Sequence, residues 1–329
     1  MFVVVSTLVT VGALWVVYTW ATEAFGWFAG RADRKLQLAG ALVLLVAIDR
    51  ICGAILLRWH GPAPVLVHSA MFLVFATMVL GAAPVLLLRA GSRAHALWRG
   101  PRGSTSDAAL TRRQVVEGAG GAALFGATGA MLGWGMIRGR HEFELREVPV
   151  RVPGLPRVLD GYVVVQVSDI HGGTFMGERE LGEGLALVRA ARPDLIVVTG
   201  DLVDFDAVFA APVAAQLAAL PSRDGITAVL GNHDYYAGAD AVADALRAAG
   251  ITVLVNEGRR IRPADDGGFA LLGVDDISAV RRGRAGPLLG KAIATVPTDL
   301  PRILLSHQPI TVDDWAGEVA LQLSGHTHG

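Results

Sequence analysis

The sequence contains very little cysteine and almost no net charge. Cys52 is the single cysteine among 329 residues, so no disulfide can form within the chain and cysteine usage says nothing about the redox compartment. The formal net charge of -1 excludes a general polyanion-binding protein. The sequence also lacks a Walker A loop, a dinucleotide-binding fingerprint and a basic patch with interleaved aromatic residues. We therefore expect no nucleic-acid partner.

Apolar residues, in contrast, are abundant. They make up 52% of the chain, and the mean hydropathy is +0.46, whereas soluble domains contain about 45–50% apolar residues. The excess lies before residue 138, in four segments that approach the ~20 residues needed to cross a bilayer; these are residues 2–20, 36–57, 65–88 and 115–137. We predict an all-α transmembrane region of about four helices over residues 1–138, and a second domain over residues 142–329.

The distribution of lysine and arginine predicts how these segments are oriented. Basic residues cluster after the first and the third segment, whereas the connection between the second and the third contains only Arg58. Cytoplasmic loops are rich in Lys and Arg, so we expect the amino terminus outside the cytoplasm. Residues 142–329 are then outside as well, although Arg138 and Arg140 weigh against this. The prediction is a protein that crosses the membrane several times.

An arginine pair precedes the fourth apolar segment. Residues 111–116, which contain Arg112 and Arg113, resemble a twin-arginine export signal. Such signals often carry Phe or Leu two residues after the pair, where this chain has Val115 and Val116. The pair is equally well explained as an ordinary positive-inside anchor. If it is an export signal, the twin-arginine export machinery is a partner.

The second domain alternates between strand and helix signals. Period-two patterns and short apolar runs predict strands at residues 143–152, 162–167, 195–198, 226–230, 252–256, 269–274, 303–306 and 320–324. Between them we expect helices at residues 178–191, 210–220 and 239–249, and a further helix near 288–295. Such alternation indicates an α/β fold with its helices outside the sheet.

Five of these apolar runs end on short segments of metal-binding residue types. The segments are Asp169-Ile170-His171, Gly200-Asp201, Gly231-Asn232-His233-Asp234, His307 and Gly325-His326-Thr327-His328. Loops at the carboxyl ends of strands are where α/β proteins place their sites. Chance rarely produces such a series, so the pattern predicts a metal site.

The five segments, in this order, resemble the calcineurin-like metallophosphoesterase superfamily over roughly residues 148–329. Residues 200–204 and 231–236 are most similar to bacterial membrane-associated phosphodiesterases. The resemblance implies an α/β fold made of a two-sheet sandwich flanked by helices. It also implies two divalent metal ions, whose identity is open among manganese, iron, zinc and cobalt. The first metal would take Asp169, His171, Asp201 and His328, and the second would take Asp201, Asn232, His307 and His326.

The resemblance also implies the catalytic residues. His233 would contact the phosphate and protonate the leaving oxygen, and Asp234 would orient His233. A lone aspartate at a strand end is more often a turn or cap residue. We therefore expect Asp204 to support the site rather than to bind metal, and Asp275 and Asp276 to be turn residues. No ligand of the set is substituted, which disfavours an inactive member of the superfamily.

The predicted function is a membrane-anchored, two-metal phosphoesterase of a bacterial cytoplasmic membrane. Metal-activated hydroxide would hydrolyse a phosphodiester, phosphomonoester or pyrophosphate, including a lipid-linked or cell-envelope ester. Alternatives are an enzyme like the UDP-2,3-diacylglucosamine pyrophosphatases, a membrane sensor that binds a phosphorylated ligand without turnover, and a transport unit with a hydrolase attached. Members of this superfamily usually continue beyond the last motif. Since this sequence stops at Gly329, we expect truncation at the carboxyl terminus.

Overall fold

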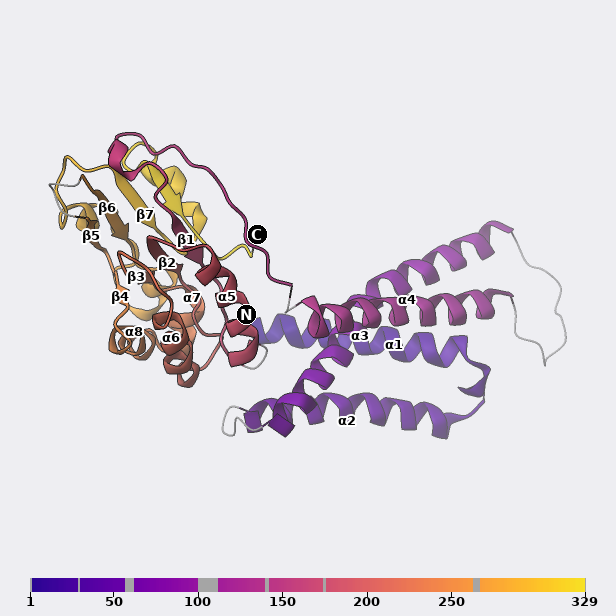
Figure 1. Ribbon diagram of the computed structural model, residues 1–329. Coiled ribbons are helices and arrows are strands. Elements are labelled where there is room, and N and C mark those ends of the chain that lie inside the picture. Colours follow the sequence, from indigo (N-terminus) through magenta and orange to yellow (C-terminus); the bar gives the residue numbers. More distant parts are fainter. Residues whose placement is uncertain are drawn as a thin grey trace. The chain divides into compact units, whose positions relative to one another are not determined.

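The computed structural model describes residues 2–28, 30–56, 62–99, 112–139, 142–173, 176–262 and 267–328. The chain divides into two compact units, a helical unit (Met1–Gly139) and an α/β unit (Arg140–Gly329), and Figure 1 shows the elements of both.

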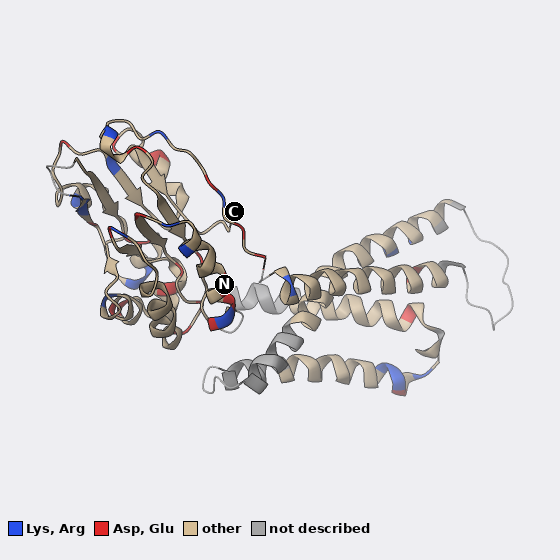
Figure 2. Cartoon of the chain, in the orientation of Figure 1, with Lys and Arg blue, Asp and Glu red and all other residues tan. Residues whose placement is uncertain are grey.

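Four long helices make up the described part of the helical unit: α1 (Phe2–Ala24), α2 (Ala32–Leu56), α3 (Pro62–Arg99) and α4 (Arg112–Ile137). Most of their residues are uncharged, as the tan ribbons in Figure 2 show. Two stretches, Leu73–His95 in α3 and Gln114–Ile137 in α4, are long and apolar enough to cross a membrane. The prediction of about four spans is thus supported for two helices and stays a prediction for α1 and α2.

The arginine pair lies at the beginning of α4. The helix starts at Arg112, so the segment that resembles an export signal runs directly into an apolar helix. Thr111 and the side chains of Arg112 and Arg113 lie outside the described residues.

Buried polar contacts connect the helices of this unit. Arg89 of α3 is buried. Its Nη2 lies 2.5 Å from Glu23 Oε2 of α1, and its Nη1 donates to Thr19 Oγ1 at 2.7 Å. Trp20 Nε1 donates to the Glu117 carbonyl oxygen of α4 at 2.8 Å. A buried guanidinium needs such partners to offset its lost hydration, and these contacts hold α1 against α3 and α4.

The first sheet of the α/β unit is parallel, and its strands follow one another in chain order: β1 (Val164–Val167), β2 (Leu195–Thr199), β3 (Ile226–Val229) and β4 (Thr252–Val253). Parallel neighbours need crossover connections, usually helical. The connections here contain α5 (Glu178–Ala190), α6 (Ala210–Ala218), the short α7 (Asn232–Ala237) and α8 (Ala239–Ala248). All of β2 is buried, as expected for an apolar strand covered on both faces.

The second sheet contains β5 (Glu257–Ile261), β6 (Phe269–Gly273), β7 (Arg302–Leu305) and β8 (Leu321–Leu323). β5 pairs antiparallel with β6, whereas β6, β7 and β8 are parallel. The short helix α9 (Leu289–Ile293) lies between β6 and β7 in the chain.

Three apolar clusters establish the layers. Leu195 and Val197 of β2 belong to a cluster that also contains Phe269 and Leu271 of β6, so this cluster lies between the sheets. The next residues along β2, Ile196 and Val198, point the other way and pack with α5, α6 and α8. On the outer face of the second sheet, β6 and β7 pack against α9. The predicted two-sheet sandwich flanked by helices is therefore present, as Figure 1 shows.

One strand predicted in this unit does not form, and one strand that forms was not predicted. No strand occurs over residues 143–152, where period two predicted one. Phe143 lies close to Gly184 of α5, whereas Val148 and Val150 are exposed, so apolar alternation occurs here without a pairing partner. Conversely, the charged segment Glu257–Ile261 forms β5 although no strand was predicted there. Its pairing with β6 outweighs the weak strand propensity of its Glu and Arg residues.

Candidate metal centre

All seven predicted metal-ligand residues lie just beyond the carboxyl ends of strands, and both sheets contribute them. The first sheet supplies Asp169 and His171 after β1, Asp201 after β2 and Asn232 after β3. The second sheet supplies His307 after β7, and His326 and His328 after β8. The sandwich thus brings residues that are up to about 160 positions apart to one edge.

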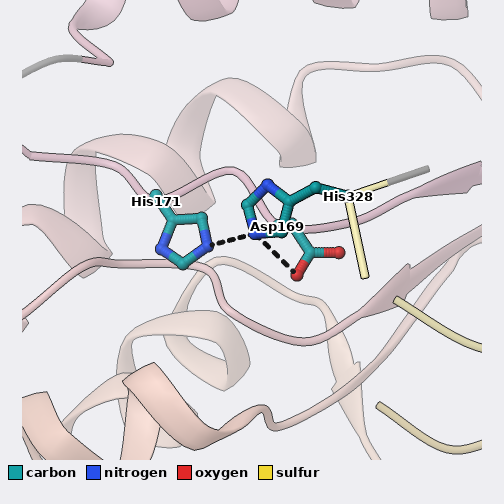
Figure 3. Close-up of side chains that lie close together, drawn as sticks. All are labelled: Asp169, His171 and His328. Carbon is teal, nitrogen blue, oxygen red and sulfur yellow. Dashed lines mark hydrogen bonds and ion pairs between the residues drawn. The ribbon is translucent and has the colours of Figure 1, made fainter. Parts of the chain in front are cut away.

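Three of these side chains form an outer group, Asp169, His171 and His328, which Figure 3 shows. His171 Nε2 lies 3.2 Å from His328 Nε2, and His328 Nε2 lies 3.7 Å from Asp169 Oδ1. The two imidazole rings are stacked, with centroids 5.1 Å apart. Both carboxylate oxygens of Asp169 also accept the His326 backbone N–H, at 2.9 and 3.0 Å. The loop after β8 is therefore held against the loop after β1.

The others form an inner group, Asp201, His307 and His326, with Asn232 beside them. His307 Nδ1 donates to the Thr199 carbonyl oxygen at 2.8 Å. Its Nε2 then faces Asn232 Oδ1 at 3.0 Å and Asp201 Oδ2 at 3.2 Å, and both of these are acceptors. With its hydrogen on Nδ1, the neutral His307 ring also offers a lone pair at Nε2. This nitrogen and the two oxygen atoms can lie so close only if a proton or a cation lies among them.

The pKa of His307 reflects the same arrangement. Burial by itself lowers this pKa, but the hydrogen bond to Asp201 and the negative charge of that carboxylate raise it to about 9. A divalent cation would satisfy the same nitrogen and oxygen atoms in place of the proton. Imidazole nitrogens, carboxylate oxygens and one amide oxygen are a donor set that suits such a cation.

Asp201 lies between the two groups. Its Oδ2 is 3.2 Å from His307 Nε2 and 3.7 Å from His171 Nε2. Its Oδ1 accepts the His233 backbone N–H at 2.8 Å, which fixes the carboxylate. One carboxylate therefore faces side-chain atoms of both groups.

Glycines in two of the motifs permit this close approach. A Cβ on Gly200, whose φ is +95°, would lie 2.7 Å from both the Gly231 nitrogen and His307 Nδ1. A Cβ on Gly231 would collide with the Asp201 carboxylate. Only glycine lets the ends of β2 and β3 and the His307 ring pack together at this point.

Backbone strain is concentrated in the same residues. Among the described part of the chain, eight non-glycine residues have positive φ, and five of these are predicted ligands: Asp169, His171, Asp201, His326 and His328. Such conformations are uncommon for residues with a Cβ and persist where the surroundings impose them. The fold therefore holds these side chains in positions that relaxed loops would avoid.

His233 lies beside the outer group, with Asp204 behind it. His233 Nδ1 is 2.9 Å from the Asp204 carbonyl oxygen and 3.0 Å from its carboxylate Oδ1. Both atoms are acceptors, so Nδ1 carries the hydrogen and Nε2 is left to face a ligand. The rings of Phe205 and Tyr236 flank His233, with centroids 5.1 and 5.2 Å from its own. Neither aromatic residue was predicted to belong to the site.

Asp234 has a different position from the predicted one. It is fully buried, and its carboxylate accepts backbone N–H groups from Leu202, Val203 and Gly231 at 2.9, 3.3 and 2.9 Å. Burial raises its pKa to about 7 although these donors lower it. The structure thus places Asp204 against the His233 ring, where we had expected Asp234, and Asp234 connects the loops after β2 and β3.

Comparisons with known proteins agree with this geometry. The family model for calcineurin-like phosphoesterases matches residues 162–329. An uncharacterized metallophosphoesterase from Bacillus subtilis is 32% identical over 228 residues, which cover 67% of this chain and 77% of the relative. A second one, from Campylobacter jejuni, is 33% identical over 188 residues, or 56% of this chain and 48% of the relative.

A vertebrate relative is described as a membrane protein. A "transmembrane protein with metallophosphoesterase domain" from Danio rerio is 32% identical over 209 residues, or 61% of this chain. The match spans about half the length of this relative and of the Campylobacter jejuni protein. The family model and the Bacillus subtilis relative, together with the ligand groups at the strand ends, show that this chain belongs to the calcineurin-like phosphoesterase family.

Proposed function

We propose that this chain is a membrane-anchored hydrolase of phosphoric esters that uses two divalent metal ions. The observation that carries the proposal is the pair of ligand groups that meet at Asp201. Asp169, His171, Asp201 and His328 would hold one ion, and Asp201, Asn232, His307 and His326 the other. Bound there, the ions would acidify a water molecule and neutralise charge on the phosphate oxygens.

The side chains around the ions have separate tasks in this proposal. His233 would present its Nε2 to the ester, because Nδ1 donates to Asp204. As an imidazolium, the ring would transfer its Nε2 proton to the leaving oxygen and become neutral. Asp204 would hold the ring in this tautomer and stabilise its positive charge. Asp234 would act indirectly, by keeping the loop that carries Asn232 and His233 against the loop after β2.

The class of ester that the site hydrolyses is a matter for experiment. Phosphodiesters, phosphomonoesters and pyrophosphates all fit chemistry of this kind. We propose that the helical unit crosses the membrane several times and that the α/β unit lies outside the cytoplasm, with Arg112-Arg113 acting as an export signal. The apolar helices, and the description of the Danio rerio relative as a transmembrane protein, support membrane association. Reporter fusions after Ile137 and Arg99 would test the orientation, since opposite compartments are expected at these two positions.

The test of catalysis uses the full chain in detergent. We would assay bis-p-nitrophenyl phosphate against p-nitrophenyl phosphate, first without metal and then with manganese. Metal-dependent turnover is expected, and the preferred ester identifies the class of substrate. His233→Asn should lose about 10²–10⁴-fold in turnover but keep its metal content, because His233 is not assigned as a ligand. A chain that binds manganese and phosphate but hydrolyses neither ester, with His233→Asn indistinguishable from it, would instead be a sensor.

A further inference from the structure

Exposed apolar side chains gather on the loops that surround the candidate metal centre. They follow four different strands: Phe205 follows β2, Tyr236 follows β3, Ile277 and Val280 follow β6, and Ile310 and Val312 follow β7. Phe205 is 61% exposed and Ile310 67%. These are the carboxyl ends of the strands, and the loops after β2, β3 and β7 also carry predicted ligands. We refer to these six side chains as the apolar rim.

The loops of the apolar rim contact one another. Phe205 and Tyr236 both lie against His233. Next to Tyr236, the Tyr235 hydroxyl donates to the Asp275 carboxylate at the start of the loop that carries Ile277 and Val280. The loops that carry Phe205, Tyr236, Ile277 and Val280 are therefore connected to one another at and next to His233.

The loop after β7 is hydrogen-bonded to the loop after β6. Gln308 Nε2 donates to both Asp276 carboxylate oxygens, at 3.2 and 3.0 Å, just before Ile310 and Val312. Asp276 also accepts the Ser278 N–H at 2.7 Å. Because buried polar contacts hold the backbone of these loops, the apolar side chains point outward from ordered segments.

Charge does not explain this surface. Arg281 and Arg282 are exposed on the loop after β6, but Asp313 and Asp314 are exposed on the loop after β7, so the opposite charges balance. Exposed apolar side chains that gather on neighbouring loops mark sites where a protein meets an apolar partner. Such a surface next to a phosphate-ester site suits a substrate with a hydrocarbon part beside its phosphate.

We propose that the apolar rim binds the hydrocarbon part of a phosphate ester embedded in a lipid bilayer, so that the substrate is a membrane lipid. This rests on the proposed function, because it assigns the substrate class of the same site. The chain itself supplies the connection to a membrane, since the rim's unit begins at Arg140, directly after an apolar helix (Gln114–Ile137) long enough to cross one. The hydrocarbon would contact the rim while the phosphate reaches His233 and the ligand groups.

The test is a series of p-nitrophenyl phosphodiesters that differ only in the second alcohol. Methyl, butyl and octyl esters are assayed in solution with the full chain and manganese, and a hexadecyl ester is assayed in phosphatidylcholine vesicles that contain the chain. Burial of two methylene groups is enough for about a tenfold gain in kcat/KM. We expect at least that gain from methyl to octyl, and ready hydrolysis of the hexadecyl ester in vesicles.

Variants show whether the rim causes the gain. Val280→Ser combined with Ile310→Ser removes two rim side chains that have no assigned role in catalysis or metal binding, and should bring the octyl-to-methyl ratio within about threefold. Because the ratio is measured within one protein, a partly folded variant does not distort it. Val158→Ser is the matched control. Val158 is 69% exposed but lies before β1 and beside Gly267, at the opposite ends of the strands. Its ratio should equal that of the unchanged chain.

Three results would overturn the inference. They are a ratio near one in the unchanged chain, a high ratio that survives in the double variant, and failure to hydrolyse the hexadecyl ester in vesicles. The last result, together with a high ratio in solution, would indicate a free amphiphile as substrate. If the methyl ester is not hydrolysed either, and neither are bis-p-nitrophenyl phosphate and p-nitrophenyl phosphate, the proposed function fails first. Hydrolysis of the methyl ester without a chain-length effect removes only the lipid assignment.

Discussion

The inner and outer ligand groups use the same residue types but differ in burial. In the inner group, the side chains of His307 and Asp201 are 0% and 2% exposed. In the outer group, the side chains of His171 and His328 are 21% and 59% exposed. Asp201, Asn232 and His307 of the inner group lie where β2, β3 and β7 end, whereas His326 of that group is exposed and shares the loop after β8 with His328. Burial therefore links Asp201 and His307 to fold stability, and leaves His171 and His328 more independent of the fold.

Replacing Asp201 should have the largest effect, because it removes the side chain that both groups share. We expect Asp201→Ala to lose both metal ions and at least about 10³-fold in turnover. Metal analysis and hydrolysis of the preferred ester are the measurements. Asp206→Ala removes a carboxylate from the same loop, where Asp206 accepts the Val208 N–H, and should change turnover less than threefold. If Asp201→Ala keeps one ion fully bound, Asp201 is not a ligand that both groups share.

Matched histidine truncations compare the stability contribution of the groups directly. His307→Ala leaves a cavity and removes the partner of the Thr199 carbonyl, so it should destabilise the metal-free fold by about 2–4 kcal/mol. His328→Ala removes a mostly exposed ring and should cost less than about 1 kcal/mol. Urea unfolding without metal measures both. Equal losses of stability would contradict the distinction between the groups.

Of the two carboxylates near His233, we expect Asp204 to contribute to turnover and Asp234 to contribute to stability. Asp204→Asn should lower turnover by about 10–100-fold, since the carboxylate beside His233 Nδ1 becomes a neutral amide, with little loss of stability. Asp234→Asn should instead destabilise by about 1–3 kcal/mol, because one of three backbone N–H donors then faces an amide group. Turnover per folded molecule, measured beside unfolding, distinguishes them. If the two effects are exchanged, Asp234 orients His233 as the sequence first suggested.

Sequence alone predicted the parts of the fold in which local pattern and tertiary environment agree. The largely apolar runs that became β1, β2, β3 and β7 end in motif residues, so their position and the clustering of the predicted ligands followed from the pattern. Residues 143–152 show the limit, because alternation predicts an extended chain but not a partner strand. In β5 the opposite occurs: its charged composition does not predict a strand, but its pairing with β6 makes it one.

The arrangement around His233 was predicted only in part for a physical reason. Asp204 and Asp234 both lie in motif loops, and spacing along the chain does not tell which carboxylate turns toward the ring. Which carboxylate turns toward the ring depends on the backbone N–H donors nearby. Such donors surround Asp234 and hold its carboxylate in the core. Phe205 and Tyr236 gave no periodic signal, because they lie in loops where exposure follows no repeat.

The smallest expected effect concerns metal binding by the two groups, and it tests directly whether the inner group binds its ion without the outer group. Manganese bound only to the folded state raises stability in proportion to the logarithm of its concentration, so saturating manganese should raise the Tm of the α/β unit in the full chain. In His328→Ala the inner group keeps all its ligands, and the variant should lose only about 2–4 °C of that rise, which corresponds to roughly 1 kcal/mol. His95→Ala, which replaces a histidine of the helical unit, is the control and should keep the whole rise. Loss of the entire rise in His328→Ala would mean that the two groups bind their ions as one unit, and that the difference in burial has no consequence for metal binding.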